Sequence, residues 1–137
     1  MIRFFSENNF KKYENRKLST WIKKTVLEEK KKAGDINIIF CDDDYLLEVN
    51  KKYLNHNYFT DVITFDYSEN KMVSGDIYIS TDTVLKNATD YKVEFYEELK
   101  RIIIHGTLHL LGYKDKTKKE ISTIRAKEDY YLSLFNN

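Results

Sequence analysis

The chain of 137 residues contains no proline, four glycines and a single cysteine. One cysteine, Cys41, excludes a disulfide within the chain, and this favours a reducing, intracellular environment. Cys41 follows the apolar run INIIF, so we expect a buried and unreactive thiol. Because proline is absent, the boundaries of helices and strands must be inferred from glycine, asparagine and aspartate.

Long apolar runs and an excess of charge of one sign are also missing. No stretch approaches the roughly 18 apolar residues of a membrane span, and the N-terminal MIRFFSENNF lacks the apolar segment of a secretory signal. The net charge is only +1, which argues against tight capture of free duplex nucleic acid. We therefore expect a cytoplasmic protein that does not enter a membrane. Its length suits one domain, residues 1–137.

The hydrophobic pattern predicts strands that alternate with helices, followed by a hairpin and further helices. The predicted strands are 2–5, 35–42, 60–67 and 75–80, and the last two form the hairpin. The predicted helices are 16–33, 43–54, 81–89, 93–112 and a final one from Thr117. This order predicts an α+β fold, in which helices pack around a small mixed β-sheet of about four strands.

Helix ends are predicted from individual residues. Gly34 and Gly112 are expected to end the first and fourth helices, and Asp43 or Asp44 to cap the second. The last helix begins with the T-x-x-E spacing of a capping box, formed by Thr117 and Glu120.

The last helix also has a predicted buried side. Ile121, Ile124, Tyr131 and Phe135 form its apolar stripe, and Glu128 lies on the same stripe. A carboxylate there either pairs with an arginine or lysine, caps a loop, or orients a histidine of a site.

The stretch HGTLHLLGYKD (105–115) carries the candidate chemistry. His105 and His109 are four residues apart, so both rings project from one face of a helix and can share one zinc ion. Gly112 lets the chain turn back, and Asp115 then follows as a third ligand. Three protein ligands leave the fourth position of a zinc ion open to water, which is typical of catalytic sites.

A zinc peptidase is one alternative, because residues 105, 109 and 115 have the spacing of H-E-x-x-H-x-x-G-x-x-H. In that motif the residue after the first histidine is the glutamate that acts as general base. Here that residue is Gly106, which has no side chain to accept a proton. A non-catalytic ribosome-assembly factor, with a metal that serves stability, is a second alternative.

The stretch HGTLHLLGYKD resembles the signature H-G-x-L-H-L-x-G-Y-D-H of the YbeY endoribonucleases, the rRNA maturation factors. NKKYLNHNYFTDVITF (50–65), SGDIYIS (74–80) and EELKRIIIHG (97–106) resemble further motifs of that family, in the same order. The resemblance implies a small mixed sheet with a helical layer and a zincin-like metal helix. It also implies one zinc per chain, bound by His105, His109 and Asp115, where Asp115 replaces a histidine.

The resemblance further implies an endoribonuclease that acts on single-stranded regions of rRNA or pre-rRNA, in ribosomal RNA maturation and ribosome quality control. The ribosome is the implied partner, and we assume a monomer. The nucleophile is expected to be either a metal-bound water or the RNA 2′-hydroxyl, and Asp61 and Asp76 are the carboxylates expected to reach the cleft. Leu54 stands where the family commonly has a phosphate-binding arginine, so either Lys51, Lys52 or Lys114 supplies that charge or the activity is reduced.

Other side chains could contact RNA. Tyr53, Tyr58 and Tyr113 are candidates for stacking on bases of a single strand. His56 is a further candidate contact, with a solvated loop position as the alternative.

Overall fold

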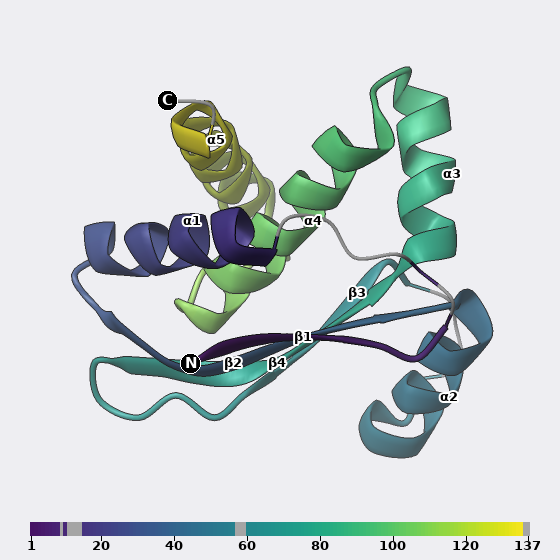
Figure 1. The fold of residues 1–137 in the computed structure, drawn as a ribbon, viewed down its shortest axis with the longest axis horizontal. Coiled ribbons are helices and arrows are strands. Elements are labelled where there is room, and N and C mark those ends of the chain that lie inside the picture. The colour runs from purple at the N-terminus through teal and green to yellow at the C-terminus, as the bar shows by residue number, and fades with distance from the viewer. Residues whose placement is uncertain (9, 11–14, 57–59, 136–137) are drawn as a thin grey trace.

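The computed structural model describes residues 1–8, 10, 15–56 and 60–135, and it places four strands in one mixed sheet (Figure 1). The strands are β1 (Ile2–Ser6), β2 (Lys32–Cys41), β3 (Val62–Asp66) and β4 (Met72–Ser80). Their order is β1-β2-β4-β3, with β1, β2 and β4 parallel and β3 antiparallel to β4. The predicted fold class and the β3–β4 hairpin are therefore confirmed.

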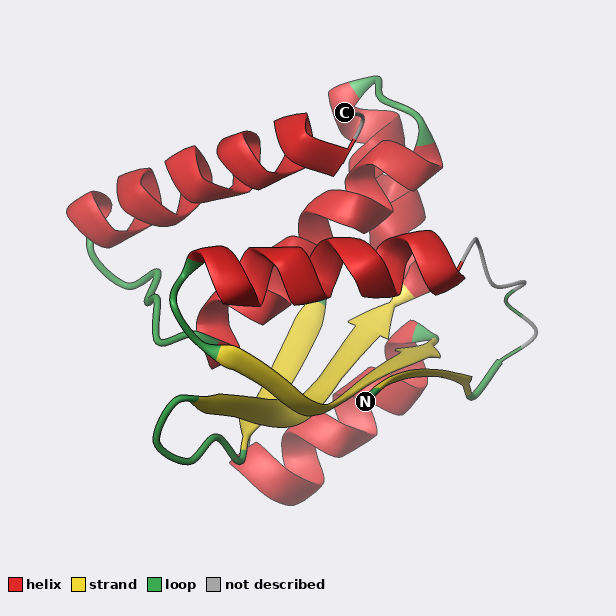
Figure 2. Ribbon diagram, turned by 60° about the vertical axis from the view of Figure 1, so that its left-hand side comes forward, coloured by secondary structure: helices red, strands yellow, loops and turns green. Residues whose placement is uncertain are grey.

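In the described part of the chain, five helices surround this sheet (Figure 2). They are α1 (Asn15–Glu28), α2 (Asp43–Leu54), α3 (Thr81–Tyr91), α4 (Phe95–Leu110) and α5 (Lys118–Phe135). In Figure 1, α2 alone covers one face of the sheet, whereas the other four helices lie on the opposite side. Among the described residues, none of these helices combines the length and the apolar composition needed to cross a membrane.

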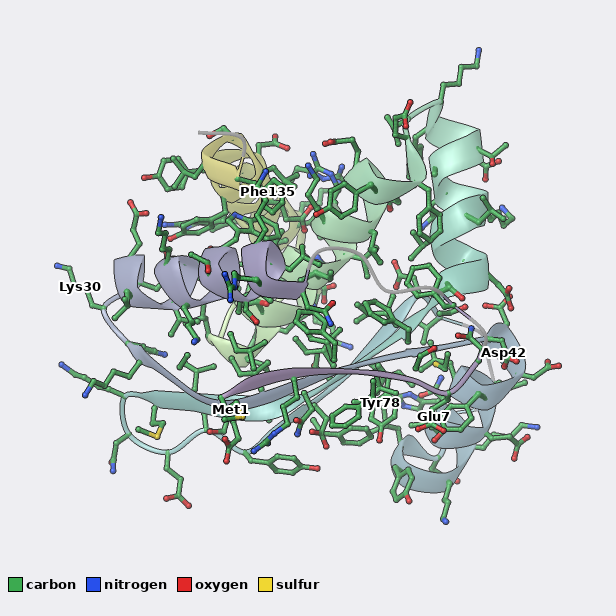
Figure 3. All side chains as sticks on the ribbon, viewed as in Figure 1. Met1, Glu7, Lys30, Asp42, Tyr78 and Phe135 are labelled. Atoms are coloured by element: carbon green, nitrogen blue, oxygen red, sulfur yellow. The ribbon has the colours of Figure 1, made fainter. Side chains whose placement is uncertain are left out.

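The main core lies between the sheet and α4. The alternation of β4 turns Val73, Ile77 and Ile79 towards this side, where they are buried with residues of α4 such as Leu99 and Ile103. Figure 3 shows Phe135 among the helices on this side of the sheet and Tyr78 on the side of α2. Cys41 belongs to the smaller cluster under α2, and burial raises the pKa of its thiol to about 12. The predicted buried thiol is confirmed.

Gly106 explains how closely α4 approaches the sheet. A Cβ atom at this position would lie 2.7 Å from Cγ2 of Ile77 on β4, closer than van der Waals contact allows. The missing side chain therefore sets the distance between helix and sheet.

Two predicted helix boundaries were wrong. The first helix ends at Glu28 and not at 33, because Lys30 (φ 63°) adopts the left-handed conformation that ends it, and Gly34 lies inside β2. The cap of α2 is Asp42, whose side chain accepts a hydrogen bond from the Tyr45 amide at 2.8 Å, and not Asp43 or Asp44. Asp42, Asp43 and Asp44 are consecutive carboxylates, so the sequence pattern did not distinguish them.

The residues predicted to end α4 and to begin α5 are confirmed. Gly112 (φ 103°) donates to the His109 carbonyl at 3.0 Å, and Tyr113 donates to the Leu108 carbonyl at 3.0 Å, which is the Schellman pattern. Thr117 and Glu120 exchange hydrogen bonds of 2.9 and 3.1 Å in a capping box.

One residue of the predicted apolar stripe of α5 was misplaced. Ile124, Tyr131 and Phe135 are buried, but Ile121 is 46% exposed. It lies in the first turn of α5, where the helix has not yet reached the core. Glu128, on the same stripe, is buried as predicted.

Candidate metal centre

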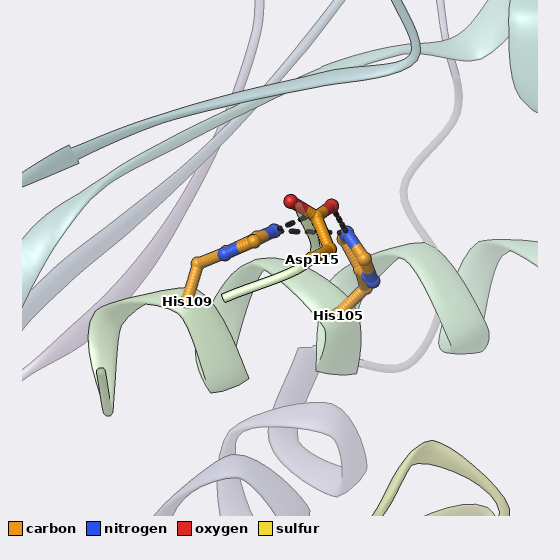
Figure 4. A group of neighbouring side chains, drawn as sticks. All are labelled: His105, His109 and Asp115. Carbon is orange, nitrogen blue, oxygen red and sulfur yellow. Dashed lines mark hydrogen bonds and ion pairs between the residues drawn. The ribbon is translucent and has the colours of Figure 1, made fainter. Parts of the chain in front are cut away.

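His105, His109 and Asp115 bring three potential ligand atoms together at the C-terminal end of α4 (Figure 4). The two Nε2 atoms lie 3.0 Å apart. Oδ2 of Asp115 lies 3.4 Å from Nε2 of His105 and 3.3 Å from Nε2 of His109. The three atoms thus form a nearly equilateral triangle.

The hydrogen bonds of the other ring nitrogens fix the tautomers. Nδ1 of His109 lies 2.9 Å from the Tyr113 carbonyl, which can only accept, so this nitrogen carries a proton. Nδ1 of His105 lies 2.6 Å from Oε2 of Glu128, again an acceptor. In the neutral rings, both Nε2 lone pairs therefore point into the same space as the Asp115 carboxylate. Three acceptors facing one another need a proton or a metal cation between them.

The dimensions of the triangle suit a zinc ion. Ligand atoms at 2.0–2.1 Å from a tetrahedral zinc lie about 3.3 Å from one another, and the three observed separations are 3.0, 3.3 and 3.4 Å. The side chain of Asp115 is 39% exposed, and those of the histidines are about half as exposed. The cluster is therefore accessible from one side, as in catalytic rather than closed structural sites.

Glu128 on α5 connects His105 to an arginine. Its Oε2 binds the histidine, while its Oε1 accepts from Nη1 of Arg101 at 2.9 Å. Burial by itself would raise the pKa of Glu128, but His105 and Arg101 lower it more, so this buried carboxylate is ionised. Two of the alternatives predicted for Glu128 are thus true together: it pairs with an arginine, and it orients a histidine of the site.

The surroundings of His105 favour positive charge. Burial by itself would lower the pKa of His105, yet the hydrogen bond and charge of Glu128, followed by Asp61 and Asp115, raise it. A site that stabilises an extra proton on an imidazole through several carboxylates also stabilises a divalent cation in the same position.

A cavity of about 600 Å³ opens beside His105 and Asp115, between α3, α4 and α5. Asp61 lines it, so the structure brings this candidate carboxylate to the site. Glu98 and Arg101 of α4 also line it, and burial raises the pKa of Glu98. The sequence reasoning missed both residues, although their spacing of seven and four from His105 places them on its face of the helix.

Of the other predicted site residues, only Lys114 lies beside the three candidate ligands. Asp76 of β4 accepts a hydrogen bond from Nδ2 of Asn37 at 3.0 Å, and strand alternation directs it away from α4, because its neighbour Ile77 packs against Gly106. Lys51 and Lys52 belong to α2, on the opposite face of the sheet from α4 (Figure 1). Lys114 is exposed and directly precedes Asp115.

The candidate RNA contacts have varied surroundings. Tyr53, Leu54 and His56 are exposed at the end of α2 and just beyond it. Tyr113 is half-buried, and its hydroxyl donates to Glu29 at 2.6 Å. Tyr58 lies outside the described residues.

The fold and the site together define the class of protein: a mixed sheet carrying a metal helix, with the ligand arrangement of a metal-dependent hydrolase. Comparison with known proteins agrees. The family model described as endoribonuclease YbeY matches residues 3–136. The chain belongs to this family, the YbeY endoribonucleases.

Individual relatives cover nearly the whole chain. It is 52% identical to the endoribonuclease YbeY of Flavobacterium psychrophilum over 136 residues, covering 99% of this chain and 97% of the relative. It is 47% identical to the endoribonuclease YbeY of Christiangramia forsetii, covering 98% of this chain and 94% of the relative. The solution structure of a Thermotoga maritima protein is similar in fold, with a TM-score of 0.67 and 28% identity over 98% of this chain and 89% of that one.

Proposed function

We propose that this protein is a zinc-dependent endoribonuclease that cleaves single-stranded regions of rRNA or pre-rRNA during ribosome maturation and quality control, in the cytoplasm. The observation that carries the proposal is the convergence of His105, His109 and Asp115 on one point beside a cavity. The family supports the reaction class, and the resemblance described above supports the ribosomal role. One domain, residues 1–137, would contain the whole site.

Side chains of this protein would hold and orient the metal. His105 and His109 would bind it through Nε2, since their Nδ1 atoms are engaged by Glu128 and the Tyr113 carbonyl. Asp115 would complete the set. A bound zinc ion supplies a Lewis acid for a phosphoryl oxygen and lowers the pKa of a coordinated water towards ~7.

The aspartate changes the charge of the site. Two neutral histidines and one carboxylate give the metal one negative ligand, which makes it less electrophilic than three histidines would. The carboxylate also suits harder metals somewhat better. Zinc is the metal that we propose, with one ion per chain.

Asp61 is the carboxylate that we propose to act near the reacting phosphate. It lines the cavity with His105 and contributes to the electrostatics of that histidine. Within the cavity it would accept or relay a proton. Lys114, exposed next to Asp115, is the lysine best placed to attract an RNA phosphate to the site.

The reaction class is tested by incubating the protein with single-stranded RNA and, separately, with denatured casein, each with and without a chelator. We expect cleavage of RNA that the chelator abolishes, zinc restores and His105→Ala eliminates. Cleavage of casein would favour the peptidase alternative instead.

The ribosomal role needs a second assay, because an assembly factor would bind ribosomes without cutting RNA. Co-sedimentation with ribosomal particles is measured for the wild type and His105→Ala, together with cleavage of rRNA. Ribosome binding that is unaffected by His105→Ala, with no chelator-sensitive cleavage by the wild type, would identify a non-catalytic factor.

A further inference from the structure

We infer that Glu29, at the end of α1, is a positioning residue for the metal site and acts through Tyr113. The inference rests on the metal binding proposed above. The hydroxyl of Tyr113 donates to Oε1 of Glu29 at 2.6 Å, and the carbonyl of the same tyrosine lies 2.9 Å from Nδ1 of His109. One residue thus connects the carboxylate of Glu29, in the turn just after α1, to a proposed metal ligand.

Glu29 is itself held firmly. Its side chain is 13% exposed, and its Oε2 accepts hydrogen bonds from the hydroxyl of Tyr131 and from Nζ of Lys127, the latter at 3.1 Å. Both partners belong to α5, and Tyr131 is buried. Glu29 therefore occupies a fixed point where α1 and α5 meet, and Tyr113 is attached to that point.

The hydrogen bond between Tyr113 and Glu29 anchors the loop that carries the third candidate ligand. Residues 111–117 connect α4 to α5 and carry Asp115, the third ligand, only two positions after Tyr113. A second bond links the same two parts of the chain, since Nζ of Lys31 donates to the Leu111 carbonyl at 3.1 Å. Without the hydrogen bond from the Tyr113 hydroxyl to Glu29, the backbone at Tyr113 would be more mobile. Its carbonyl would then orient His109 less well, and Asp115 would be held less firmly in position.

The variant that tests this is Tyr113→Phe, which removes the hydroxyl and keeps the ring. Its matched control is Tyr131→Phe, which removes another hydroxyl bound to the same carboxylate but one that does not lead to the metal. Zinc affinity is measured for both by competition with a chromogenic chelator, and the visible spectrum of the Co²⁺-loaded protein reports the ligand geometry.

We expect Tyr113→Phe to weaken zinc binding by about tenfold, the lower end of the range for outer partners of metal ligands, and to alter the cobalt spectrum. Tyr131→Phe should change both much less than Tyr113→Phe does, because Nζ of Lys127 still binds Oε2 of Glu29, although the loss of the hydroxyl lowers the unfolding temperature. Glu29→Ala should weaken zinc binding as much as Tyr113→Phe does. The double variant should be no weaker than either single variant, because both act through one hydrogen bond.

The inference is overturned if Tyr113→Phe binds zinc as tightly as the wild type, or if Tyr131→Phe loses as much affinity. Additive losses in the double variant would overturn it as well. A wild-type protein that binds no zinc would refute the proposed function itself, and that result is visible before any variant is made.

Discussion

Nδ1 of His105 lies 2.6 Å from Oε2 of Glu128, although 23 residues separate them in the chain. The contact joins the metal helix α4 to α5 and turns Nε2 of His105 towards His109 and Asp115. Because Glu128 also binds Arg101, its orientation is fixed from both sides. The geometry of the site therefore depends on a residue that is not itself a ligand.

Glu128→Gln should weaken zinc binding by about 10–100-fold, since the amide is a poorer acceptor for the histidine N–H than the carboxylate. The matched control is Asp129→Asn, because Asp129 also pairs with Arg101, at 2.8 Å, but is 61% exposed and does not contact His105. The zinc affinities of the two variants, measured by equilibrium competition with a chelator, distinguish their effects. Equal affinities for both variants and the wild type would show that Glu128 does not orient the ligand.

Gly106→Ala should destabilise the fold by about 1–3 kcal/mol, the usual cost of overpacking a core. The new methyl would lie 2.7 Å from Cγ2 of Ile77, which is buried and β-branched and so cannot move aside cheaply. The gain in helix propensity, about 1 kcal/mol, should not compensate. Urea unfolding measures the difference, and a variant as stable as the wild type or more so would show that α4 can shift away from β4.

Thr117→Ala should cost about 1 kcal/mol of unfolding free energy, because it removes the side-chain acceptor of the capping box at the start of α5. Thr123→Ala is the control, at an exposed position within the same helix, where alanine should be neutral or slightly stabilising. The capping role would be contradicted if the two substitutions changed the urea midpoint equally.

Glu29 should make the stability of the protein depend on pH in the acid range. Burial by itself would raise the pKa of Glu29, but hydrogen bonds from Tyr113, Tyr131 and Lys127 lower it below the ordinary value of 4.5. The ionised carboxylate thus stabilises the fold above pH 4.5, and this contribution is lost as the pH falls through the lowered pKa.

The measurement is the unfolding free energy of the wild type and Glu29→Gln from pH 7 downward. The wild type should be more stable at neutral pH, and the difference should shrink below pH 4.5. A difference that stays constant with pH would show that the charge of Glu29 contributes nothing.

The sequence predicted the parts of the fold that depend on local chemistry. Alternation of apolar residues indicated the hairpin, and the capping box and Gly112 marked helix ends, because each depends on hydrogen bonds within a few residues. The prediction that Gly34 ends the first helix was wrong because it, too, was based only on neighbouring residues. A glycine beside a helix suggests its end, but Lys30 adopts the left-handed conformation, and Gly34 instead fits closely against Ser74 and Met72 of β4.

The candidate ligands could be predicted because His105, His109 and Asp115 lie within eleven residues on a helix and the turn after it. Not all of the surrounding residues could be assigned from local patterns. Glu29 reaches the site through contacts between elements far apart in the sequence, and Asp76 was misjudged because the sequence of β4 does not show which of its faces turns towards α4. Only the packing of Ile77 on Gly106 reveals which way β4 turns.

The most direct test is the zinc content of the protein purified without a metal-affinity tag. Elemental analysis should find close to one zinc per chain in the wild type and in the control Asp129→Ala, and far less in His109→Ala and Asp115→Ala. A wild-type protein with well under one equivalent, matched by both ligand variants, would contradict the assignment of these three residues as the metal site.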